Sequence, residues 1–343
     1  MDRVRLASLL ERFGDLTVLV IGDVFLDKYL ELDRRLSEVS LETGLEAHQV
    51  IQVRCSPGAA GTAMNNLRAL GVSVVTLGVI GDDGEGYELK RAVRAIGVGS
   101  SLLIECPDWL TPTYTKPMMH EPDGWVHEIN RIDIKNRAPL PAEIEDRIIV
   151  RLREALPHVH GIVIADQVPE ANCGVITERV RGELCAQARN HPGKAFVADS
   201  RERIGLFADV ILKPNAREAV RAVQPRAHAA ERTVVEACGM ALAARAHRPV
   251  FVTVGEDGIL VCDHDHIDRV STRPASGPID TVGAGDSVMA GLVSSLCAGA
   301  SAREAAIVGN LVASVTIRQI GTTGTASPEQ VLKAFDAANL TCV

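Results

Sequence analysis

The sequence lacks the features of secreted, membrane-spanning and disulfide-bonded proteins. Its eight cysteines include no Cys-x-x-Cys pair, and several lie in apolar stretches, where a free thiol behaves as a small hydrophobic side chain. No apolar run is long enough to span a bilayer, and no basic segment precedes an apolar run near the first residue. We therefore expect a cytoplasmic protein with reduced cysteines and without a signal peptide.

Two common nucleotide-binding motifs are also missing. No G-x-x-x-x-G-K-[ST] string occurs, which argues against a P-loop kinase. The first strand-like run is not followed by G-x-G-x-x-G, which argues against an NAD-binding Rossmann domain. The net charge of −8 argues against general binding to nucleic acid or to a membrane surface.

The pattern of apolar residues predicts an α/β protein. The apolar run from Thr17 to Ile21 is typical of a strand buried in a parallel sheet. From residue 142 onward, helical and strand patterns alternate, which predicts a parallel sheet with helices on both faces. Helices are expected at 88–96, 142–155, 172–190, 231–247 and over most of 285–335. Further strands are expected at 72–80, 161–165, 195–198, 210–212 and 250–254.

Residues 28–56 and 101–133 differ from the rest of the chain. They are charged and contain short alternating segments, which predicts one small β-sheet that is inserted twice into the main domain. The cluster His264-Asp265-His266 lies between two strand-like runs, so we interpret it as a polar hairpin turn rather than a metal site.

The stretch from Pro278 to Ser287 has the residues needed for phosphate chemistry. Gly283 and Gly285 stand where a loop becomes an apolar helix, so backbone N–H groups and the helix N-terminus can hold an anion there. Asp286 would repel that anion, but it can accept a proton from a hydroxyl that attacks a phosphoryl group. The alternative is a tight turn in which Asp286 only caps the helix.

The full string Asp280-Thr281-Val282-Gly283-Ala284-Gly285-Asp286 resembles the C-terminal signature of the ribokinase or PfkB family of sugar kinases. The resemblance implies a ribokinase-like three-layer α/β/α sandwich, with a mostly parallel central sheet and a small β-sheet lid, over residues 1–343 as a single domain. It also implies transfer of the ATP γ-phosphoryl group to a sugar hydroxyl. Asp286 would be the general base, and the N–H groups of Gly283, Ala284 and Gly285 would stabilise the developing charge. The implied cofactors are ATP and Mg²⁺, and a monovalent cation is left open as an activator.

Other segments match the family's nucleotide site. Asn215-Ala216-Arg217-Glu218 resembles its N-x-x-E motif, in which Asn215 and Glu218 would support Mg²⁺ through oxygen atoms; on their own these residues are equally compatible with a helix cap. Residues 253–258 resemble the nucleotide-binding turn, and 309–322 resemble the segment that covers adenine. The resemblance thus assigns the nucleotide to Lys213, Asn215, Thr253, Gly255, Gly258 and Asn310.

The expected sugar site begins after the first strand. Gly22 to Asp27 has the spacing of the family's first sugar-binding segment, in which Asp27 would accept hydrogen bonds from hydroxyls. Asp23 and Asp166 end apolar strands, where ligands tend to lie, although Asp23 is equally compatible with a turn cap. The expected substrate contacts are Asp27, Gly58, Ala59, Thr62, Lys116 and Asp166.

Within the family, the chain looks most like the kinase part of the bacterial heptose kinases, which implies phosphorylation at C1 of a heptose 7-phosphate. We expect the nucleotidyltransferase domain of the two-domain versions to be absent. Three departures concern the substrate. The family's Gly-Gly-Ala-Ala-Asn reads Gly-Ala-Ala-Gly-Thr over 58–62, its Lys-x-Arg reads Lys-Pro-Met over 116–118, and its Tyr-Gly-Lys-Gly after Asp166 is missing. The lost arginine weakens the case for a phosphorylated sugar.

Two other functions compete with a sugar kinase. A nucleoside kinase would use the same constellation and would need aromatic side chains in the lid, which offers Tyr29, Trp109, Tyr114 and Trp125. A non-catalytic sugar or nucleotide sensor would explain the altered 58–62 loop but not the intact Asp286. Because a lid sheet of this kind pairs with another subunit, we expect a homodimer, and no nucleic-acid or membrane partner.

Overall fold

The computed structural model describes residues 1–226, 231–263, 265–272, 277–321 and 323–340. Its largest feature is an eight-stranded sheet in the order β17-β16-β15-β14-β13-β12-β1-β6. The strands from β6 to β15 in this order are parallel, and β16 and β17 are antiparallel to them. Their bounds are β1 (Thr17–Gly22), β6 (Ser73–Leu77), β12 (Gly161–Asp166), β13 (Ala195–Ser200), β14 (Ile211–Leu212), β15 (Val250–Thr253), β16 (Ile259–Asp263) and β17 (His266–Val270).

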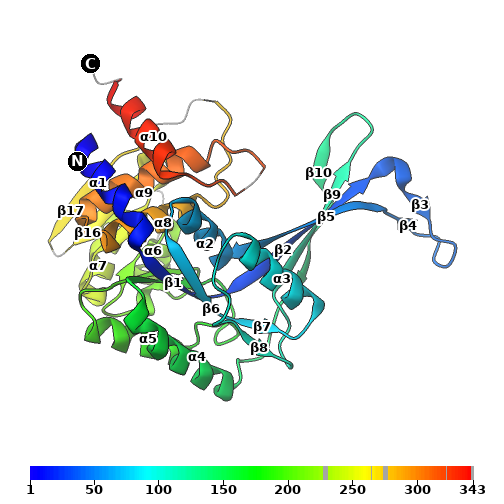
Figure 1. Ribbon diagram of the computed structural model, residues 1–343, viewed down its shortest axis with the longest axis horizontal. Helices are drawn as coiled ribbons and strands as arrows, with labels where there is room; N and C mark the ends of the chain where they lie inside the picture. Colours follow the sequence, from blue (N-terminus) through cyan, green and yellow to red (C-terminus); the bar gives the residue numbers. More distant parts are fainter. Residues whose placement is uncertain (227–230, 264, 273–276, 322, 341–343) are drawn as a thin grey trace.

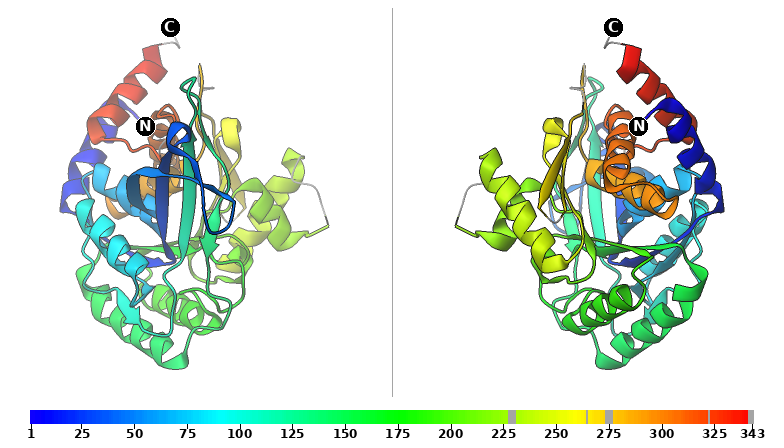
Figure 2. Two further views of the ribbon diagram at one scale, coloured as in Figure 1. Left: turned by 90° about the vertical axis from the view of Figure 1, so that its right-hand side faces the viewer. Right: turned by 90° about the vertical axis from the view of Figure 1, so that its left-hand side faces the viewer.

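Helices cover both faces of this sheet (Figures 1 and 2). Successive side chains of a strand point to opposite faces, so Val18 and Val20 of β1 lie in one hydrophobic core and Leu19 and Ile21 lie in the other. The first core includes residues of α1 (Arg3–Glu11), α2 (Ala60–Ala69), α3 (Gly84–Ala95), α8 (Ala284–Cys297), α9 (Ala302–Thr316) and α10 (Pro328–Leu340). The second includes residues of α4 (Ala142–Ala155), α5 (Glu178–Asn190), α6 (Ala216–Val223) and α7 (Arg232–Ala246). The predicted three-layer α/β/α sandwich with a mostly parallel sheet is confirmed.

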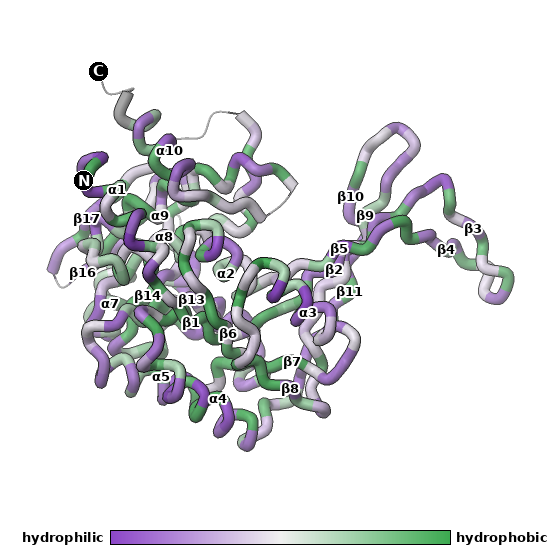
Figure 3. Tube along the Cα trace, in the orientation of Figure 1, coloured by the Kyte–Doolittle hydropathy of each residue, from purple (hydrophilic) through white to green (hydrophobic). Residues whose placement is uncertain are grey.

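A second, five-stranded sheet projects from one side of the sandwich (Figure 1). We call it the small sheet; its strands are β2 (Val24–Asp33), β5 (Val50–Ala59), β9 (Thr113–His120), β10 (Val126–Glu128) and β11 (Ile132–Ile134). A short hairpin, β3 (Glu38–Val39) and β4 (Glu46–Ala47), lies at its far end. Figure 3 shows mixed polar and apolar residues along this sheet, in contrast to the hydrophobic central strands. Since β2 follows β1 after Asp23, the small sheet begins at the C-terminal edge of the central sheet.

Several expected boundaries are wrong. The strand expected at 72–80 divides at Gly78 into β6 and β7 (Val79–Gly81), and β7 pairs with β8 (Ile104–Cys106) in a separate two-stranded sheet. The second part of the small sheet therefore begins at Thr113 and not at residue 101. Helix α5 begins at Glu178 and not at 172, because the Thr177 hydroxyl caps it by accepting a hydrogen bond from the Val180 N–H.

Short 3₁₀ helices complete the chain: η1 (Arg12–Asp15), η2 (Arg34–Leu36), η3 (Leu156–His158), η4 (Ile204–Leu206) and η5 (Gly255–Asp257). His264, the first residue of the expected hairpin turn, lies outside the described residues. Among the residues that are described, no helix has the length and apolar character needed to cross a bilayer.

The junction between β5 and α2 contains a strained residue. Ala59 has φ 52° and ψ −117°, and a left-handed conformation costs an L-residue about 1–2 kcal/mol. Glycine adopts such angles without that cost, although its freer unfolded chain takes back about 0.4–1 kcal/mol. We predict that Ala59→Gly raises the free energy of unfolding, by at most about 1.6 kcal/mol.

The matched control is Ala60→Gly, which introduces the same residue at the first position of α2. It removes a buried methyl group and leaves no strain to relieve, so it lowers stability. Urea unfolding measures both variants; an Ala59→Gly protein that loses as much stability as Ala60→Gly contradicts the prediction.

Candidate active site

The N-terminus of α8 lies at the C-terminal edge of the central sheet. Gly283 is the N-cap of α8 and has φ 79°, a conformation that favours glycine. The N–H groups of Gly285 and Asp286 donate to no atom of the described chain. The loop before them is held by Asp280, whose carboxylate accepts hydrogen bonds from the N–H groups of Val282 and Gly321. Two free donors and the positive end of the helix dipole therefore meet at one point, as an anion site requires.

The Asp286 carboxylate stands at this point without a partner. Among the described residues it makes no hydrogen bond or ion pair, and the N-cap position belongs to Gly283, so Asp286 does not cap the helix. Burial, followed by the nearby charge of Asp199, raises the pKa of Asp286 to about 7 against the opposing effects of Lys213 and Arg201. A carboxylate with a pKa near neutrality is suited to act as a general base.

Lys213 links this carboxylate to the neighbouring strands. It follows β14 and is buried, and its Nζ donates to Asp199 Oδ2 at 2.8 Å. The same Nζ lies 3.6 Å from the position that a Cβ would take on Gly285. Burial alone would lower the pKa of Lys213, but the charges of Asp199, Glu218 and Asp286 hold it above its usual value. One ammonium group thus lies among three carboxylates beside the anion site.

Asn215 and Glu218 lie next to this group and form a capping box at the start of α6. The Glu218 N–H donates to Asn215 Oδ1 at 2.9 Å, and the Asn215 N–H donates to Glu218 Oε2 at 2.8 Å. Glu218 keeps its second carboxylate oxygen, and burial followed by the charge of Asp199 raises its pKa. Mg²⁺ takes one or two carboxylates together with phosphate oxygens and water. The excess of carboxylates over Lys213 fits such a metal.

Four of the expected nucleotide residues line one cavity of about 280 Å³ that reaches the N-terminus of α8. These four are Thr253, Gly255, Gly258 and Asn310. An adjoining groove of about 620 Å³ includes Asn215 and shares Thr253 and Gly255 with the cavity. The Asn310 amide donates to Val270 O at 2.8 Å, which fixes α9 against β17 at the cavity wall. Of the six residues expected to bind the nucleotide, only Lys213 does not line this cavity or groove. It lies next to Gly285.

The structure brings most of the expected sugar residues together near the β5–α2 junction. Lys116 Nζ lies 3.1 Å from Asp27 Oδ1. A Cβ on Gly58 would lie 2.6 Å from Asp27 Oδ2, so no other residue fits there without displacing the carboxylate. Thr62 is buried, and its methyl carbon lies 3.2 Å from the Cβ position of Gly283. The β5–α2 junction that includes Ala59 therefore connects Asp27 to the anion site.

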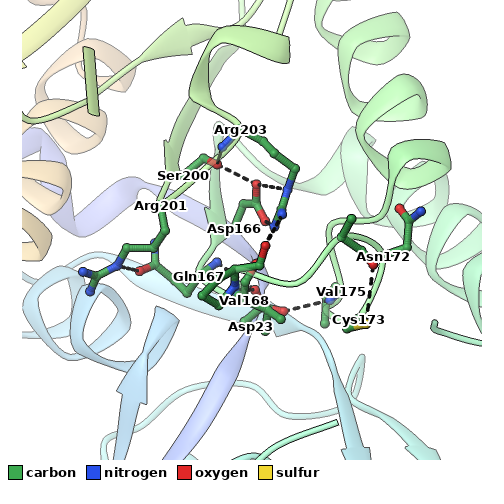
Figure 4. Close-up of polar contacts among 12 residues, drawn as sticks. Asp23, Asp166, Gln167, Val168, Asn172, Cys173, Val175, Ser200, Arg201 and Arg203 are labelled. Carbon is green, nitrogen blue, oxygen red and sulfur yellow. Dashed lines mark hydrogen bonds and ion pairs between the residues drawn. The ribbon is translucent and has the colours of Figure 1, made fainter. Parts of the chain in front are cut away.

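Asp166, which was expected to contact the substrate, does not have a free carboxylate. Its Oδ1 accepts from Arg203 Nη2 at 2.6 Å, and its Oδ2 accepts from the Ser200 hydroxyl at 2.6 Å (Figure 4). The contacts of Asp23 match the alternative of a turn cap, because its carboxylate accepts hydrogen bonds from the N–H groups of Gln167, Val168 and Val175 at 2.7–3.0 Å. Burial raises the pKa of Asp23 to about 6 in spite of these hydrogen bonds. Both buried carboxylates hold the loop after β12.

Sequence reasoning missed three charged residues of this edge: Asp199, Arg201 and Arg203. The only feature of the sequence that could have indicated them is their position at the end of an apolar strand, because ligands bind at the C-terminal ends of strands in parallel sheets. Asp199 binds Lys213, Arg203 binds Asp166, and Arg201 donates from Nε to Gln167 Oε1 at 2.9 Å.

An anion site at a helix N-terminus, an unpaired carboxylate beside it and an adjoining nucleotide-sized cavity define a phosphotransferase with a ribokinase-like fold. Residues 17–330 match the pfkB family of carbohydrate kinases. The chain therefore belongs to the pfkB family and is a carbohydrate kinase. Kinases of this family use ATP together with a divalent metal.

Similar proteins agree with this assignment. The bifunctional protein HldE of Pelobacter propionicus is 28% identical over 340 residues, which are 99% of this chain and 67% of that protein. The HldE protein of Geobacter metallireducens is 30% identical over 337 residues, 97% of this chain and 65% of that protein. The chain thus spans about two thirds of these relatives.

Solved structures show the same fold. Phosphofructokinase-2 from Escherichia coli in complex with potassium has a TM-score of 0.71 at 16% identity, and the match covers 94% of this chain and 99% of that one. Ribokinase of Arabidopsis thaliana, complexed with ribose and ATP, has a TM-score of 0.66 at 18% identity, with 93% and 98% covered.

The capping box allows a test of the metal site. We predict that Asn215→Ala and Glu218→Ala each raise the Mg²⁺ concentration needed for half-maximal activity by roughly 10-fold or more, because an outer-shell anchor of the metal is lost. Asn215→Ala also removes a helix cap, which costs about 1 kcal/mol of stability.

Ser301→Ala is the matched control. Ser301 forms the equivalent capping box with Glu304 at the start of α9, so this variant loses a comparable cap away from Lys213. Mg²⁺ titrations of activity, with the melting temperature measured alongside, separate the two effects. A Mg²⁺ requirement that moves equally in all three variants removes Asn215 and Glu218 from the metal site.

Proposed function

We propose that the chain uses Mg·ATP to phosphorylate a hydroxyl group of a sugar or sugar phosphate, with Asp286 as general base. One observation supports this most strongly: the Asp286 carboxylate has no partner among the described residues and lies beside the free N–H groups of Gly285 and Asp286. An unpaired carboxylate beside an anion site repels the anion. A sensor that only bound ligands would therefore not need such a carboxylate.

In the proposed reaction, each group of residues at the C-terminal edge of the central sheet has its own role. Asp27 orients the acceptor through its hydroxyls, and Asp286 takes the proton of the attacking hydroxyl. The Ala284 N–H already donates to Thr281 O at 3.1 Å, so the free N–H groups of Gly285 and Asp286 and the buried ammonium of Lys213 stabilise charge on the transferring phosphoryl group. Asn215 and Glu218 would hold the waters and oxygen ligands of Mg²⁺, which neutralises the nucleotide phosphates. A monovalent cation is a further proposed activator, since the similar phosphofructokinase-2 was solved in complex with potassium.

The small sheet serves in this proposal as a lid that excludes water during transfer. Its residues also support the proposed homodimer, because β5 is an edge strand and carries exposed apolar side chains. Those of β5 and the neighbouring hairpin are Val39, Leu41, Leu45, Val50, Ile51 and Val53. A cytoplasmic location, where ATP is abundant, fits the proposed activity.

The contacts of the lid aromatics favour a carbohydrate over a nucleoside. Cationic side chains lie over the rings of Tyr29 and Tyr114, at 4.4–5.7 Å from the ring centres. Trp109 is buried, and Trp125 stacks on His127 in the β9–β10 hairpin. The rings of Tyr29, Tyr114 and Trp109 are therefore covered by cations or buried, whereas the exposed Trp125 keeps one face that His127 does not cover. The proposed substrates remain sugars and sugar phosphates, with heptose 7-phosphate as the specific candidate that the sequence resemblance supports.

The test is ADP formation by the full chain with Mg·ATP across matched sets of sugars, sugar phosphates and nucleosides. We predict ADP formation that depends on a carbohydrate acceptor and yields one phosphorylated product per ADP, as measured by mass spectrometry. ADP formation only with nucleosides would support a nucleoside kinase instead. Tight ATP binding without turnover on any acceptor would contradict the proposed function and favour a sensor.

A further inference from the structure

The groove of about 620 Å³ beside the nucleotide cavity contains a cation that is not paired. Three charged side chains line the groove: Arg217, Arg232 and Asp257. Arg232 Nε lies 3.2 Å from Glu236 Oε1, so its charge is already balanced. Arg217 is exposed, and its guanidinium makes no hydrogen bond or ion pair within the described part of the chain. An unbalanced cation in a concave surface attracts an anionic ligand.

The groove and the nucleotide cavity meet at Thr253, Gly255 and Thr281, which line both. The cavity reaches Gly285 at the N-terminus of α8, where the anion site suits the phosphoryl group that is transferred. Apolar side chains form the rest of its wall and suit a nucleobase. They are Ile259, Ile279, Val288, Ala313 and Ile317. The phosphates between the base and the transferred group are therefore expected at the three shared residues, next to the groove.

The backbone that carries Arg217 is tied to one of these shared residues. Arg217 is the second residue of α6, and the capping box of Asn215 and Glu218 encloses it. Asn215 forms a parallel β-bridge with Thr253, and the Thr253 N–H donates to Pro214 O at 3.0 Å. The start of α6 and the end of β15 are therefore held side by side. The Arg217 side chain thus lies in the same groove as Thr253, where the middle phosphates are expected.

We propose that Arg217 binds the nucleotide through the phosphates that ADP and ATP have in common, and that it thereby sets the affinity for both. This inference rests on the proposed function, in which ATP is the phosphoryl donor. A guanidinium offers two parallel N–H donors that match phosphate oxygens, and such charge-assisted pairs are strong. Among the described residues that line the cavity or the groove, Arg217 is the one cation free to offset the charge of these phosphates.

The experiment measures equilibrium binding of adenosine, ADP and ATP to the full chain by titration calorimetry in the presence of Mg²⁺. Arg217→Gln is expected to weaken ADP and ATP by the same factor of about 10, the lower end of what a hydrogen bond to a charged group contributes, and to leave adenosine binding unchanged. The loss shrinks at high salt because Arg217 is exposed. Arg217→Lys keeps the charge without the bidentate geometry and falls between Arg217→Gln and wild type. In turnover assays KM for ATP rises, while kcat at saturating ATP stays within a few-fold.

The matched control is Arg221→Gln. Arg221 lies one turn further along α6 and lines neither the groove nor the cavity. Its Nη1 donates to Glu202 Oε1 at 3.0 Å. The variant removes the same charge from the same helix, and it is expected to leave the affinity for all three ligands unchanged. An equal loss of ADP affinity in Arg221→Gln and Arg217→Gln would show a general charge effect and overturn the proposal.

The remaining outcomes separate this inference from the proposed function. If the wild type phosphorylates a carbohydrate and Arg217→Gln binds ADP and ATP as the wild type does, the kinase stands and the inference fails. If Arg217→Gln weakens ATP alone, Arg217 contacts the transferred phosphoryl group, and if it weakens adenosine equally, Arg217 only supports the cavity; either result overturns the proposal. If the nucleotides bind as expected and no acceptor is phosphorylated, the proposed function fails and the Arg217 assignment stands. If the wild type binds no adenine nucleotide, both fail.

Discussion

The buried ammonium group of Lys213 is the interaction on which the catalytic edge depends. It lies among Asp199, Glu218 and Asp286, which come from three separate elements of the fold. Without it, three carboxylates would repel one another at the anion site, and leaving a charge of a buried pair without its partner costs about 3–5 kcal/mol. The same arrangement sets the chemistry. The ammonium neutralises one carboxylate. The negative charge that remains adds to the effect of burial in raising the pKa of Asp286, and it suits a divalent metal.

A second pair of buried carboxylates organises the substrate side. Asp23 and Asp166 are fully engaged with backbone N–H groups, Ser200 and Arg203, and together they hold the loop after β12. Asp23 also marks the point at which the chain passes from the central sheet into the small sheet. The network therefore joins the base of the lid to the end of β13, where Arg201 emerges. The two sheets therefore meet around a network of buried hydrogen bonds and ion pairs.

The sequence allowed the fold and the chemical centre to be predicted for physical reasons. Continuous apolar runs that alternate with helical patterns reveal buried parallel strands, and the glycines around Asp286 reveal a helix N-terminus that can hold an anion. The contacts of Asp166 could not be predicted, because its partner Arg203 lies 37 residues away and only the fold brings the two side chains together. Arg201 was missed for the same reason. The predicted ends of helices and strands were wrong where a single residue determines them. Gly78 divides the expected strand 72–80, and the Thr177 cap sets the start of α5.

The central claim is that Asp286 is the base for phosphoryl transfer, and the most direct test is the turnover of Asp286→Asn. Asparagine is nearly the same size, and the native carboxylate makes no hydrogen bond within the described chain that the amide would have to replace. We predict an unchanged melting temperature, retained ATP binding and a kcat lower by about 10²–10⁴-fold, the usual contribution of general-base catalysis. A kcat within a few-fold of wild type, with the fold and ATP binding intact, would contradict the account.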